Sequence, residues 1–389
     1  MPVKNKFAEL FDQIKSWRHH LHENPELLYD TINTSAFVER KLQEFGCDKV
    51  IKGLGRTGVV GIINGKNLSS KKVIGLRADM DALPLQEKTN LNYSSKIPGV
   101  MHACGHDGHT AMLLGAAYYL AETRNFDGTA VVIFQPAEEG GGGAKEMIDD
   151  GLMEEFGIQE VYGMHNMPGL ELGAFSIKEG DFFAAADTFS ITVKGKGGHA
   201  AKPQETIDPV LISSNIVMAL QSIASRNVSP IKNVVVSVCT FITDTDSFNV
   251  IPETVTLKGT VRTFEKEVRE SARNKLMQIS KSIAQSYGGS AEINYVTGYP
   301  VMKNSPIETE IVKGIAEDVS GKSVVDAEKI MGAEDFSFML NSRKGAYILI
   351  GNGNSSSVHS PTYVFNDEVL PIGASFWAEL IETRMRTNN

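Results

Sequence analysis

Three apolar segments in the first half of the chain decide its fold class: VIGLR at residues 73–77, TAMLLGAAYYLA at 110–121 and AVVIFQ at 130–135. The first and third are short and apolar, which is typical of buried strands, whereas the second is long enough for a helix. A helix-like segment at 144–152 and a strand-like segment at 161–165 continue the alternation. This alternation predicts an α/β domain with a central, mostly parallel sheet flanked by helices.

The middle of the chain has a different order of expected elements. Its expected strands and helices, in chain order, are 188–194 (strand), 209–224 (helix), 233–242 and 254–264 (strands), 265–287 (helix) and 291–296 (strand). The order β-α-β-β-α-β is that of a ferredoxin-like α+β unit. A strand at 345–350 and a helix at 376–385 then return to the first pattern. We therefore predict a discontinuous main domain, residues 1–183 and 298–389, with a second domain inserted at 184–297.

Length, charge and cysteine content exclude several classes of protein. At 389 residues the chain exceeds what one hydrophobic core usually covers, which also favours two domains. A net charge of -9 argues against nucleic acid and anionic membranes as partners. The chain has no apolar run near the roughly 20 residues that a membrane span requires. With three cysteines and no secretion signal at its amino terminus, the protein is expected in the cytoplasm.

Acids, imidazoles and a thiol stand after the expected strands of the main domain. In open α/β sheets, ligands bind beyond the carboxyl ends of the strands, so these residues are expected to meet at one rim. They are Asp79 and Asp81 after 73–77, Glu138 and Glu139 after 130–135, His165 after the strand that begins at Val161, His359 beyond 345–350, and the loop HACGHDGH (102–109), which enters the expected helix at Thr110.

These side chains have the composition of a transition-metal site. Imidazole nitrogen, carboxylate oxygen and thiolate sulfur suit zinc and its neighbours. Cys104 and His106 can bind a cation together from one irregular loop. Adjacent residues after a strand usually point in different directions, so Glu139 can bind metal while Glu138 faces the reacting water. A metal lowers the pKa of a water that it binds, and Glu138 could then take the proton of that water.

Several motifs in fixed order resemble those of the M20 metallopeptidase and amidohydrolase family. The branch that they resemble most contains hippurate hydrolases, N-acetyl-diaminopimelate deacetylases and auxin-conjugate hydrolases. The resemblance runs nearly from end to end. Its motifs are RHHLHENPEL (18–27), GLRADMDALP (75–84), HACGHDGHTAML (102–113), FQPAEEG (134–140), MHN (164–166) and GKGGHAAKP (195–203).

The resemblance implies a site with two divalent cations, which could be zinc, manganese, cobalt or nickel. It makes Glu138 the base and Asp81 a supporting acid, and Asp79 stands where the wider family commonly has a metal-binding histidine. The implied metal ligands are Cys104, His106, Glu139, His165 and His359.

The resemblance also implies that the inserted domain forms a homodimer. In the family, the histidine that matches His199 reaches across the dimer and stabilises the tetrahedral intermediate. Asn249 and Arg262 match positions that contact the substrate, and Arg262 is expected to pair with a carboxylate.

The expected activity is hydrolysis of the amide bond of a small N-acyl amino acid, which yields a carboxylic acid and a free amino acid. A dipeptidase or aminopeptidase with the same metal centre is the alternative, although the sequence marks no clear anchor for a substrate ammonium group. A non-catalytic metal-binding or ligand-binding protein would usually have lost the base or a ligand. The sequence has neither the G-x-S-x-G elbow of serine hydrolases nor an HExxH zinc helix.

Other histidines and cysteines are interpreted as structural. Cys47 and Cys239 are expected to be small buried apolar residues. The histidines at positions 19, 20 and 22 lie in an amphipathic helix that Pro25 stops, and they are expected to pack rather than bind metal. His102 and His109 are expected to support the site or the helix entry instead of binding a cation.

Overall fold

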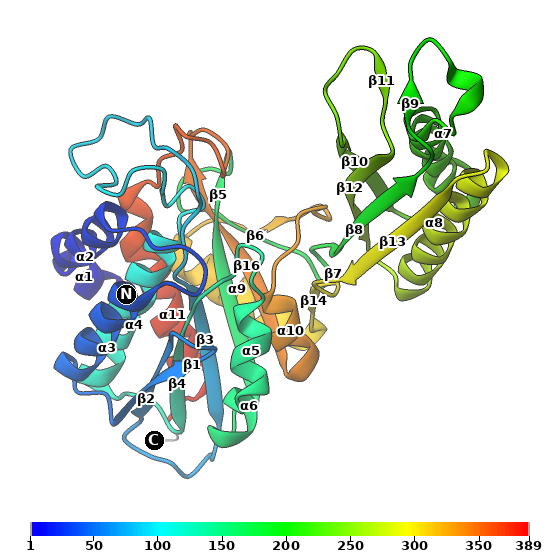
Figure 1. Cartoon of the computed structure of the whole chain (residues 1–389). Coiled ribbons are helices and arrows are strands. Elements are labelled where there is room, and N and C mark those ends of the chain that lie inside the picture. Colours follow the sequence, from blue (N-terminus) through cyan, green and yellow to red (C-terminus); the bar gives the residue numbers. More distant parts are fainter. Residues whose placement is uncertain (1, 388–389) are drawn as a thin grey trace. The chain divides into compact units, whose positions relative to one another are not determined.

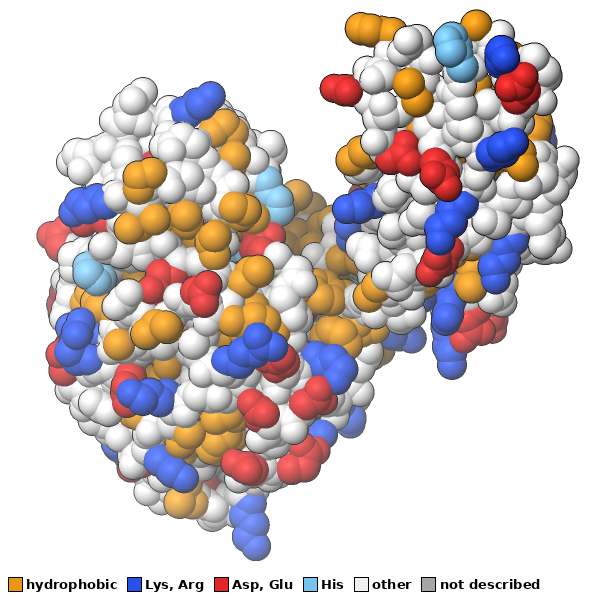
Figure 2. All heavy atoms as spheres, viewed as in Figure 1, with side chains coloured by type: hydrophobic (Ala, Val, Ile, Leu, Met, Phe, Trp, Pro, Cys, Tyr) orange, Lys and Arg blue, Asp and Glu red, His pale blue; other side chains and the backbone are white. Residues whose placement is uncertain are grey.

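The computed structural model describes residues 2–387, which form two compact units. The first unit comprises residues 2–182, 303–328 and 335–387, and the second comprises 183–302 and 329–334. Among the described residues, no helix combines the length and the apolar character that crossing a membrane requires. Acidic and basic side chains are interspersed over the viewed face of each unit (Figure 2).

The first unit is built on an eight-stranded sheet with the order β1-β2-β4-β3-β5-β16-β6-β15 (Figure 1). The neighbours β4, β3, β5 and β16 run parallel, whereas β1 and β2 form an antiparallel edge. The predicted class, a mostly parallel sheet flanked by helices, is confirmed. The strands are β1 (Lys49–Leu54), β2 (Gly58–Asn64), β3 (Val73–Asp79), β4 (Thr129–Gln135), β5 (Glu160–Pro168), β6 (Phe175–Ile177), β15 (Val325–Asp326) and β16 (Lys344–Gly353), and a small ribbon pairs β7 (Gly180–Asp181) with β14 (Lys303–Asn304).

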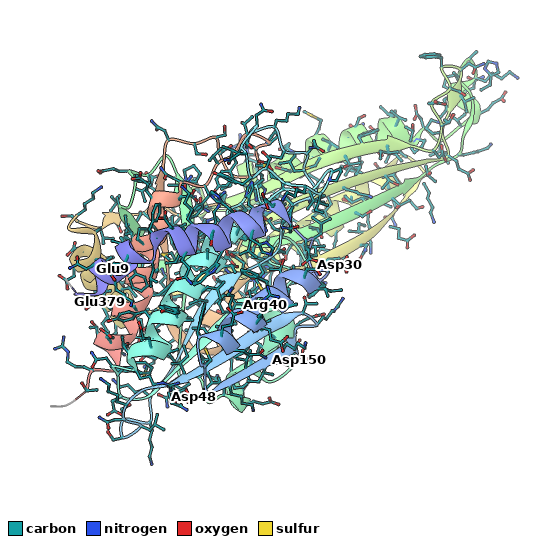
Figure 3. The ribbon with its side chains drawn as sticks, turned by 90° about the vertical axis from the view of Figure 1, so that its left-hand side faces the viewer. Glu9, Asp30, Arg40, Asp48, Asp150 and Glu379 are labelled. Atoms are coloured by element: carbon teal, nitrogen blue, oxygen red, sulfur yellow. The ribbon has the colours of Figure 1, made fainter. Side chains whose placement is uncertain are left out.

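Helices cover both faces of this sheet. One layer contains α2, α3, α4, α9 and α11, with α1 packed on α11, and the other contains α5 and α10 (Figure 1). Figure 3 shows the first layer from its outer side, with Arg40 labelled on α3. The helices are α1 (Pro2–Glu9), α2 (Phe11–Glu23), α3 (Ile32–Glu44), α4 (His106–Thr123), α5 (Gly143–Asp149), α6 (Leu152–Glu155), α9 (Pro306–Ser320), α10 (Phe336–Ser342) and α11 (Leu370–Arg384).

The central strands and helix α4 are buried almost throughout. Residues 130–135 of β4 are all buried, as both faces of a parallel sheet require when helices cover them. Helix α4 is apolar on nearly every side and packs between the sheet and the outer helices α2 and α11. This rigid layer fixes the carboxyl ends of the strands, where the candidate site lies.

Two element boundaries differ from the sequence prediction at residues of interest. Helix α4 begins at His106 instead of Thr110, because Gly105 adopts a left-handed conformation (φ 90°) that ends the loop there. Strand β5 continues beyond His165, the end of the predicted segment 161–165, since its parallel pairing with β16 continues to Pro168. His106 therefore stands on the first helical turn and His165 inside a strand, and both are held more rigidly than loop residues would be.

The second unit has the ferredoxin-like order that the sequence predicts. Its four-stranded sheet has the order β10-β12-β8-β13, all neighbours are antiparallel, and α7 and α8 pack on one face. Asp208 caps α7 by accepting hydrogen bonds from the backbone of Val210 and Leu211. The elements are β8 (Ala185–Lys194), α7 (Pro209–Ser222), β10 (Val234–Thr243), β12 (Thr254–Thr263), α8 (Lys266–Ser286), β13 (Ser290–Thr297) and a short ribbon of β9 (Gly198–His199) with β11 (Val250–Ile251).

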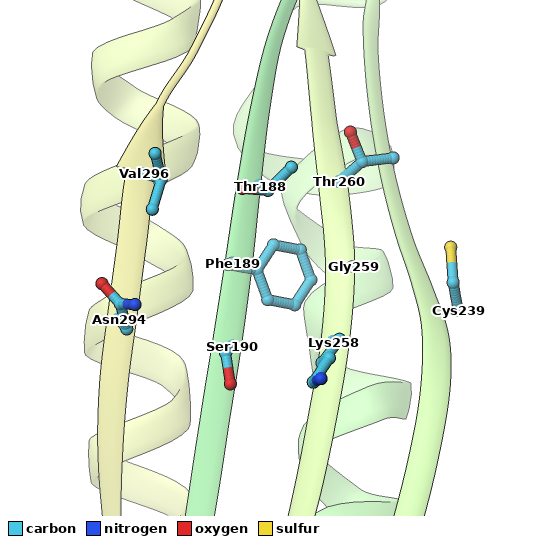
Figure 4. A pocket seen from close by; sticks show the side chains of 9 residues that line it. All are labelled: Thr188, Phe189, Ser190, Cys239, Lys258, Gly259, Thr260, Asn294 and Val296. Atoms are coloured by element: carbon cyan, nitrogen blue, oxygen red, sulfur yellow. The ribbon is translucent and has the colours of Figure 1, made fainter. Parts of the chain in front are cut away.

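The second face of this sheet is open and carries a shallow hollow (Figure 4). The Phe189 ring lies beside Gly259, where a Cβ atom would come within 2.4 Å of the ring. Cys239, also at this hollow, is exposed. The prediction that it is buried is wrong, because the register of the edge strand β10 shifts between Val238 and Thr240. None of the predicted site residues lines the hollow.

Candidate metal centre

Residues from four strand ends and one loop converge at the carboxyl rim of the first unit's sheet. Cys104 Sγ lies 3.3 Å from His165 Nε2, and His359 Nε2 lies 3.2 Å from Glu139 Oε1. Among residues 2–387, five groups of three candidate ligand atoms lie within 4.8 Å of one another, and two of these groups contain Cys104: Cys104 with His106 and His165, and Cys104 with Glu139 and His359. The structure thus brings together the five residues that the sequence singled out as ligands, with the Cys104 sulfur common to both groups.

Backbone carbonyls orient two of the imidazoles. His106 Nδ1 lies 2.8 Å from the carbonyl oxygen of Asp81, and His165 Nδ1 lies 2.6 Å from that of Asn166. Because a carbonyl only accepts, each Nδ1 carries a proton, so each ring in its neutral, ligand form would keep a lone pair on Nε2. The His165 Nε2 atom is the one that lies 3.3 Å from Cys104 Sγ. This arrangement is the one that metal-binding histidines commonly have.

The Glu138–Glu139 turn is held by Asp81. The two carboxylate oxygens of Asp81 accept hydrogen bonds from the backbone N–H groups of Glu138 and Glu139, at 3.1 Å each. Ala137 enters the turn in a left-handed conformation (φ 55°), which is strained for a residue with a side chain. An oxygen of each glutamate lies within 4.8 Å of a His106 nitrogen, so both carboxylates reach the same imidazole.

The buried atoms of this cluster fit a cation. His106 Nε2 is buried without a hydrogen-bond partner among the described residues, and the carboxylates of Asp79 and Glu139 lie 3.7 and 4.0 Å from it. An unpartnered buried nitrogen is costly, and a metal ion would satisfy its lone pair. Thiolate, imidazole and carboxylate donors together suit zinc and neighbouring transition metals. The residues present therefore fit a divalent metal.

The pKa shifts of Cys104, His359 and Glu139 indicate which of these groups carry protons before a metal binds. Burial raises the pKa of the Cys104 thiol. Hydrogen bonds with Cys104 and Glu139 raise the pKa of His359 to about 10. Burial opposes the ionised form of Glu139, but hydrogen bonding to His359 keeps the pKa of Glu139 below its ordinary value. A cation that binds these groups must displace their protons, since thiolate and neutral imidazole are the ligand forms.

Asp79 is occupied by other partners. One of its oxygens lies 2.6 Å from His109 Nδ1, and the other accepts a hydrogen bond from Arg77 at 2.7 Å. Gln135 and Asp335 also bind the Arg77 guanidinium. His109 Nε2 accepts from a backbone N–H, so both of its ring nitrogens are used within the protein. This geometry agrees with the interpretation of His109 as a supporting residue.

Two of the amino-terminal histidines, His19 and His22, belong to a separate ionic network. Arg18 Nε donates to Asp107 at 2.8 Å, and His22 Nδ1 lies 2.8 Å from the same carboxylate oxygen. His19 lies 2.8 Å from Asp367. Since Asp107 follows His106 on the first turn of α4, this network anchors that turn to α2. The interpretation of these histidines as structural agrees with these contacts.

Three predicted site residues lie in the second unit. His199 lies on the β9–β11 ribbon, and Asn249 directly precedes β11, where its carbonyl accepts a hydrogen bond from the backbone of Ala200 at 3.0 Å. The Ala201 N–H donates to His199 Nδ1 at 3.0 Å, which leaves the proton of the neutral ring on Nε2. Arg262 is half-buried on β12, and burial lowers the pKa of its guanidinium.

Sequence reasoning missed two residues that contact this centre. Asn166 and Tyr363 are fully buried, and the Tyr363 hydroxyl donates to Asn166 Oδ1 at 2.7 Å. The motif MHN at 164–166 contained a signal for Asn166, because a polar residue inside an apolar strand needs partners. No sequence signal marked Tyr363, whose contact depends on the path of the loop after β16.

Comparison with known proteins gives consistent matches over almost the whole chain. Residues 75–383 match the model of "Peptidase family M20/M25/M40". The chain is 44% identical to the hippurate hydrolase of Campylobacter jejuni, over 97% of this chain and 98% of that protein, and 38% identical to an N-acetylcysteine deacetylase of Bacillus subtilis, over 93% and 94%. A solved structure of the Bacillus subtilis YXEP protein, described as a dinuclear metal binding peptidase from the M20 family, is 33% identical, with a TM-score of 0.84 over 98% of this chain and 100% of that one.

Proposed function

Because the chain belongs to peptidase family M20/M25/M40, we propose that it is a metal-dependent amidohydrolase that cleaves the amide bond of N-acyl amino acids. The products are a carboxylic acid and a free amino acid. The observation that carries the proposal is the pair of three-residue groups that share the Cys104 sulfur, with Glu138 beside them. The activities in the names of the hippurate hydrolase and the N-acetylcysteine deacetylase support an acyl substrate.

The proposed metal ligands are the five residues of the two groups. Cys104 would contribute to both cation positions, His106 and His165 to one, and Glu139 and His359 to the other. Two divalent cations per chain are proposed, of zinc, manganese, cobalt or nickel. When bound, such cations polarise an amide carbonyl and lower the pKa of water.

Glu138 is the proposed general base and acid. The Asp81 carboxylate accepts a hydrogen bond from the backbone N–H of Glu138. The Glu138 carboxylate itself has an oxygen within 4.8 Å of candidate ligand atoms of His106 and Glu139. From there Glu138 can accept a proton from the attacking water and later donate it to the leaving nitrogen, so that the amine departs neutral. Asp81 positions this residue and His106 without itself touching the substrate.

The second unit is proposed to complete the site from a partner subunit. The proton on His199 Nε2 makes this ring a donor suited to a developing oxyanion, a contribution worth roughly 3 kcal/mol for a well-placed group. Asn249 directly precedes β11 of the same ribbon, and Arg262 would bind the substrate carboxylate. This assignment includes a homodimer formed through residues 184–297. A reducing, cytoplasmic location is also proposed, because Cys104 must stay free of disulfides.

A peptidase activity is the rival, since the matched family and the solved relative are both described as peptidases. A substrate panel separates the two. Metal-loaded protein is assayed with N-benzoylglycine, N-acetyl amino acids and dipeptides at equal concentration. We expect kcat/KM to be highest for an N-acyl amino acid. A preference for dipeptides with a free amino terminus would favour the rival, and no turnover of any member by metal-loaded protein would contradict both.

A further inference from the structure

Asn166 sits between the candidate ligands and hydrogen-bonds to two of them. Its side-chain Nδ2 donates to the backbone carbonyl of Cys104 at 2.6 Å. Its own backbone carbonyl accepts from His165 Nδ1 at 2.6 Å. Asn166 is fully buried on β5, so water does not compete for these bonds. One residue thus fixes both the loop that carries the Cys104 sulfur and the rotation of the His165 ring.

The other polar atoms of Asn166 reach two further segments of the site. Its Oδ1 accepts from the Tyr363 hydroxyl at 2.7 Å, and Tyr363 lies in the loop that also carries His359. Its backbone N–H donates to His109 Nε2 at 2.9 Å, on the helical turn that begins at His106. Hydrogen bonds from Asn166 therefore reach each chain segment that carries a candidate imidazole ligand.

The close approach at Gly105 shows how tightly Asn166 and Tyr363 fill this space. A Cβ atom at Gly105 would lie 2.4 Å from Asn166 Nδ2 and 2.5 Å from the Tyr363 hydroxyl oxygen. Gly105 also has a φ of 90°, which disfavours any side chain. The loop between Cys104 and His106 is therefore shaped around the Asn166–Tyr363 pair.

We propose that Asn166 is a positioning residue, which sets the spacing of Cys104, His165 and His359. It thereby fixes the distance between the ligands of the two proposed cation positions. The proposal rests on the metal centre described above. Partners that orient metal ligands typically change metal affinity by about 10- to 100-fold when they are removed. Asn166 differs from a usual partner in that it links several ligand segments at once.

Another buried asparagine provides a matched comparison. Asn304 donates to the carbonyls of Lys178 and Tyr347, at 2.8 and 3.0 Å, and accepts from the Tyr347 backbone at 2.7 Å. It is as buried as Asn166 and lies in the same unit, and its bonds within the described part of the chain go to Lys178 and Tyr347 and not to the candidate ligands. Its loss should lower stability without changing a metal site, which separates positioning from packing.

The test is a Co²⁺ titration of the chelator-treated full-length chain. Wild type, Asn166→Ser, Tyr363→Phe and Asn304→Ser are compared for Co²⁺ affinity, for Co²⁺ absorption and for thermal stability. We expect Asn166→Ser to weaken Co²⁺ binding by about 10- to 100-fold and to change the absorption bands that report sulfur and imidazole ligation. Tyr363→Phe should give a smaller change in the same direction. Asn304→Ser should lose stability but keep the wild-type spectrum and affinity.

The possible outcomes separate this proposal from the metal centre itself. Wild-type affinity and spectrum in folded Asn166→Ser would overturn the positioning role while leaving the centre intact. If Asn166→Ser does not fold, Tyr363→Phe decides, and an unchanged spectrum there overturns the role. Wild-type protein that binds no Co²⁺ at Cys104 would refute the centre, and the positioning role with it.

Discussion

The buried carboxylate of Asp187 in the second unit and the carboxylates around His106 in the first unit are partnered in different ways. Asp187 binds the guanidinium of Arg269, the hydroxyl of Tyr295 and the backbone N–H of Gly298. A cation of the protein itself thus balances its charge. Asp187 and its partners hold together the two ends of the segment that forms this unit.

In the metal centre, by contrast, Glu139 has only imidazoles as ion-pair partners among the described residues, namely His106 and His359. Within residues 2–387, His106 Nε2 is buried without a hydrogen-bond partner. A buried ion pair of the protein and a set of candidate metal ligands thus differ in whether the protein satisfies its own buried polar atoms. Removing one partner of the ion pair would leave a buried charge uncompensated, whereas a bound cation would satisfy the buried His106 nitrogen.

The largest expected effect is on catalysis and metal content, which substitutions of the neighbouring residues Glu138 and Glu139 should change in different ways. Glu138→Gln should lower kcat by about 10²- to 10⁴-fold, since an amide cannot transfer the proton, but metal content should stay at the wild-type level. Glu139→Gln should instead lose metal. Metal analysis measures the metal content of both variants, and steady-state assays measure their kcat. Near-normal turnover in Glu138→Gln would refute its role as the base.

The variant Asp187→Asn tests the ion pair between Asp187 and Arg269 in the second unit. Removing one partner of a buried pair leaves the other charge unbalanced, so we expect the second unit to lose about 3 kcal/mol of stability with metal content unchanged. Glu292→Gln is the control, because its contact with Lys194 is exposed and should matter by less than about 1 kcal/mol. Calorimetric unfolding measures both, and equal stabilities for the two variants would contradict the comparison.

Chelation of metal should affect the first unit and spare the second. Ligand bound only to the folded state stabilises it by about 2.7 kcal/mol when the free ligand is at 100 times its Kd. We therefore expect a chelator to lower the unfolding temperature of the first unit alone. In Glu139→Gln, the chelator should lower the unfolding temperature of the first unit by less than in wild type. A chelator effect confined to the second unit would place the bound metal elsewhere.

A smaller effect is expected from acid. Burial opposes ionisation of Asp187, but hydrogen bonds from Arg269 and Tyr295 keep the pKa of its carboxyl below the usual value. Its contribution is therefore present above the unfolded-state pKa of about 3.9 and is lost as pH falls through the lower folded-state pKa. Unfolding of Asp187→Asn should depend less on pH in this acid range than that of wild type. If the free energy of unfolding changed equally with pH in the two proteins, the proposed contribution of the Asp187–Arg269 ion pair to stability would be contradicted.

Sequence patterns predicted the fold well because buried parallel strands and amphipathic helices have strong periodicities. Boundaries near the site were less predictable. From the sequence, His106 is expected in the loop 102–109, whereas in the structure Gly105 caps α4 and His106 is the first residue of that helix. Cys239 reads as buried because its strand is apolar, but a register shift at the sheet edge exposes it.

The candidate ligands could be predicted because each follows a strand or lies in a recognisable motif. Residues that organise them could not, since hydrogen bonds such as that from Tyr363 to Asn166 join positions far apart in the chain. Their geometry depends on how the loops meet, which periodicity does not encode. The same limit applies to the strained conformation of Ala137 before the two glutamates.

Anomalous diffraction from crystals of the zinc-loaded protein tests the central claim most directly. The account predicts peaks at the zinc absorption edge about 2.3 Å from Cys104 Sγ and about 2.0–2.1 Å from nitrogens of His106, His165 and His359. It also predicts that Glu138 stays unbound to zinc. Zinc held only at other residues, with no peak within bonding distance of Cys104, would contradict the account.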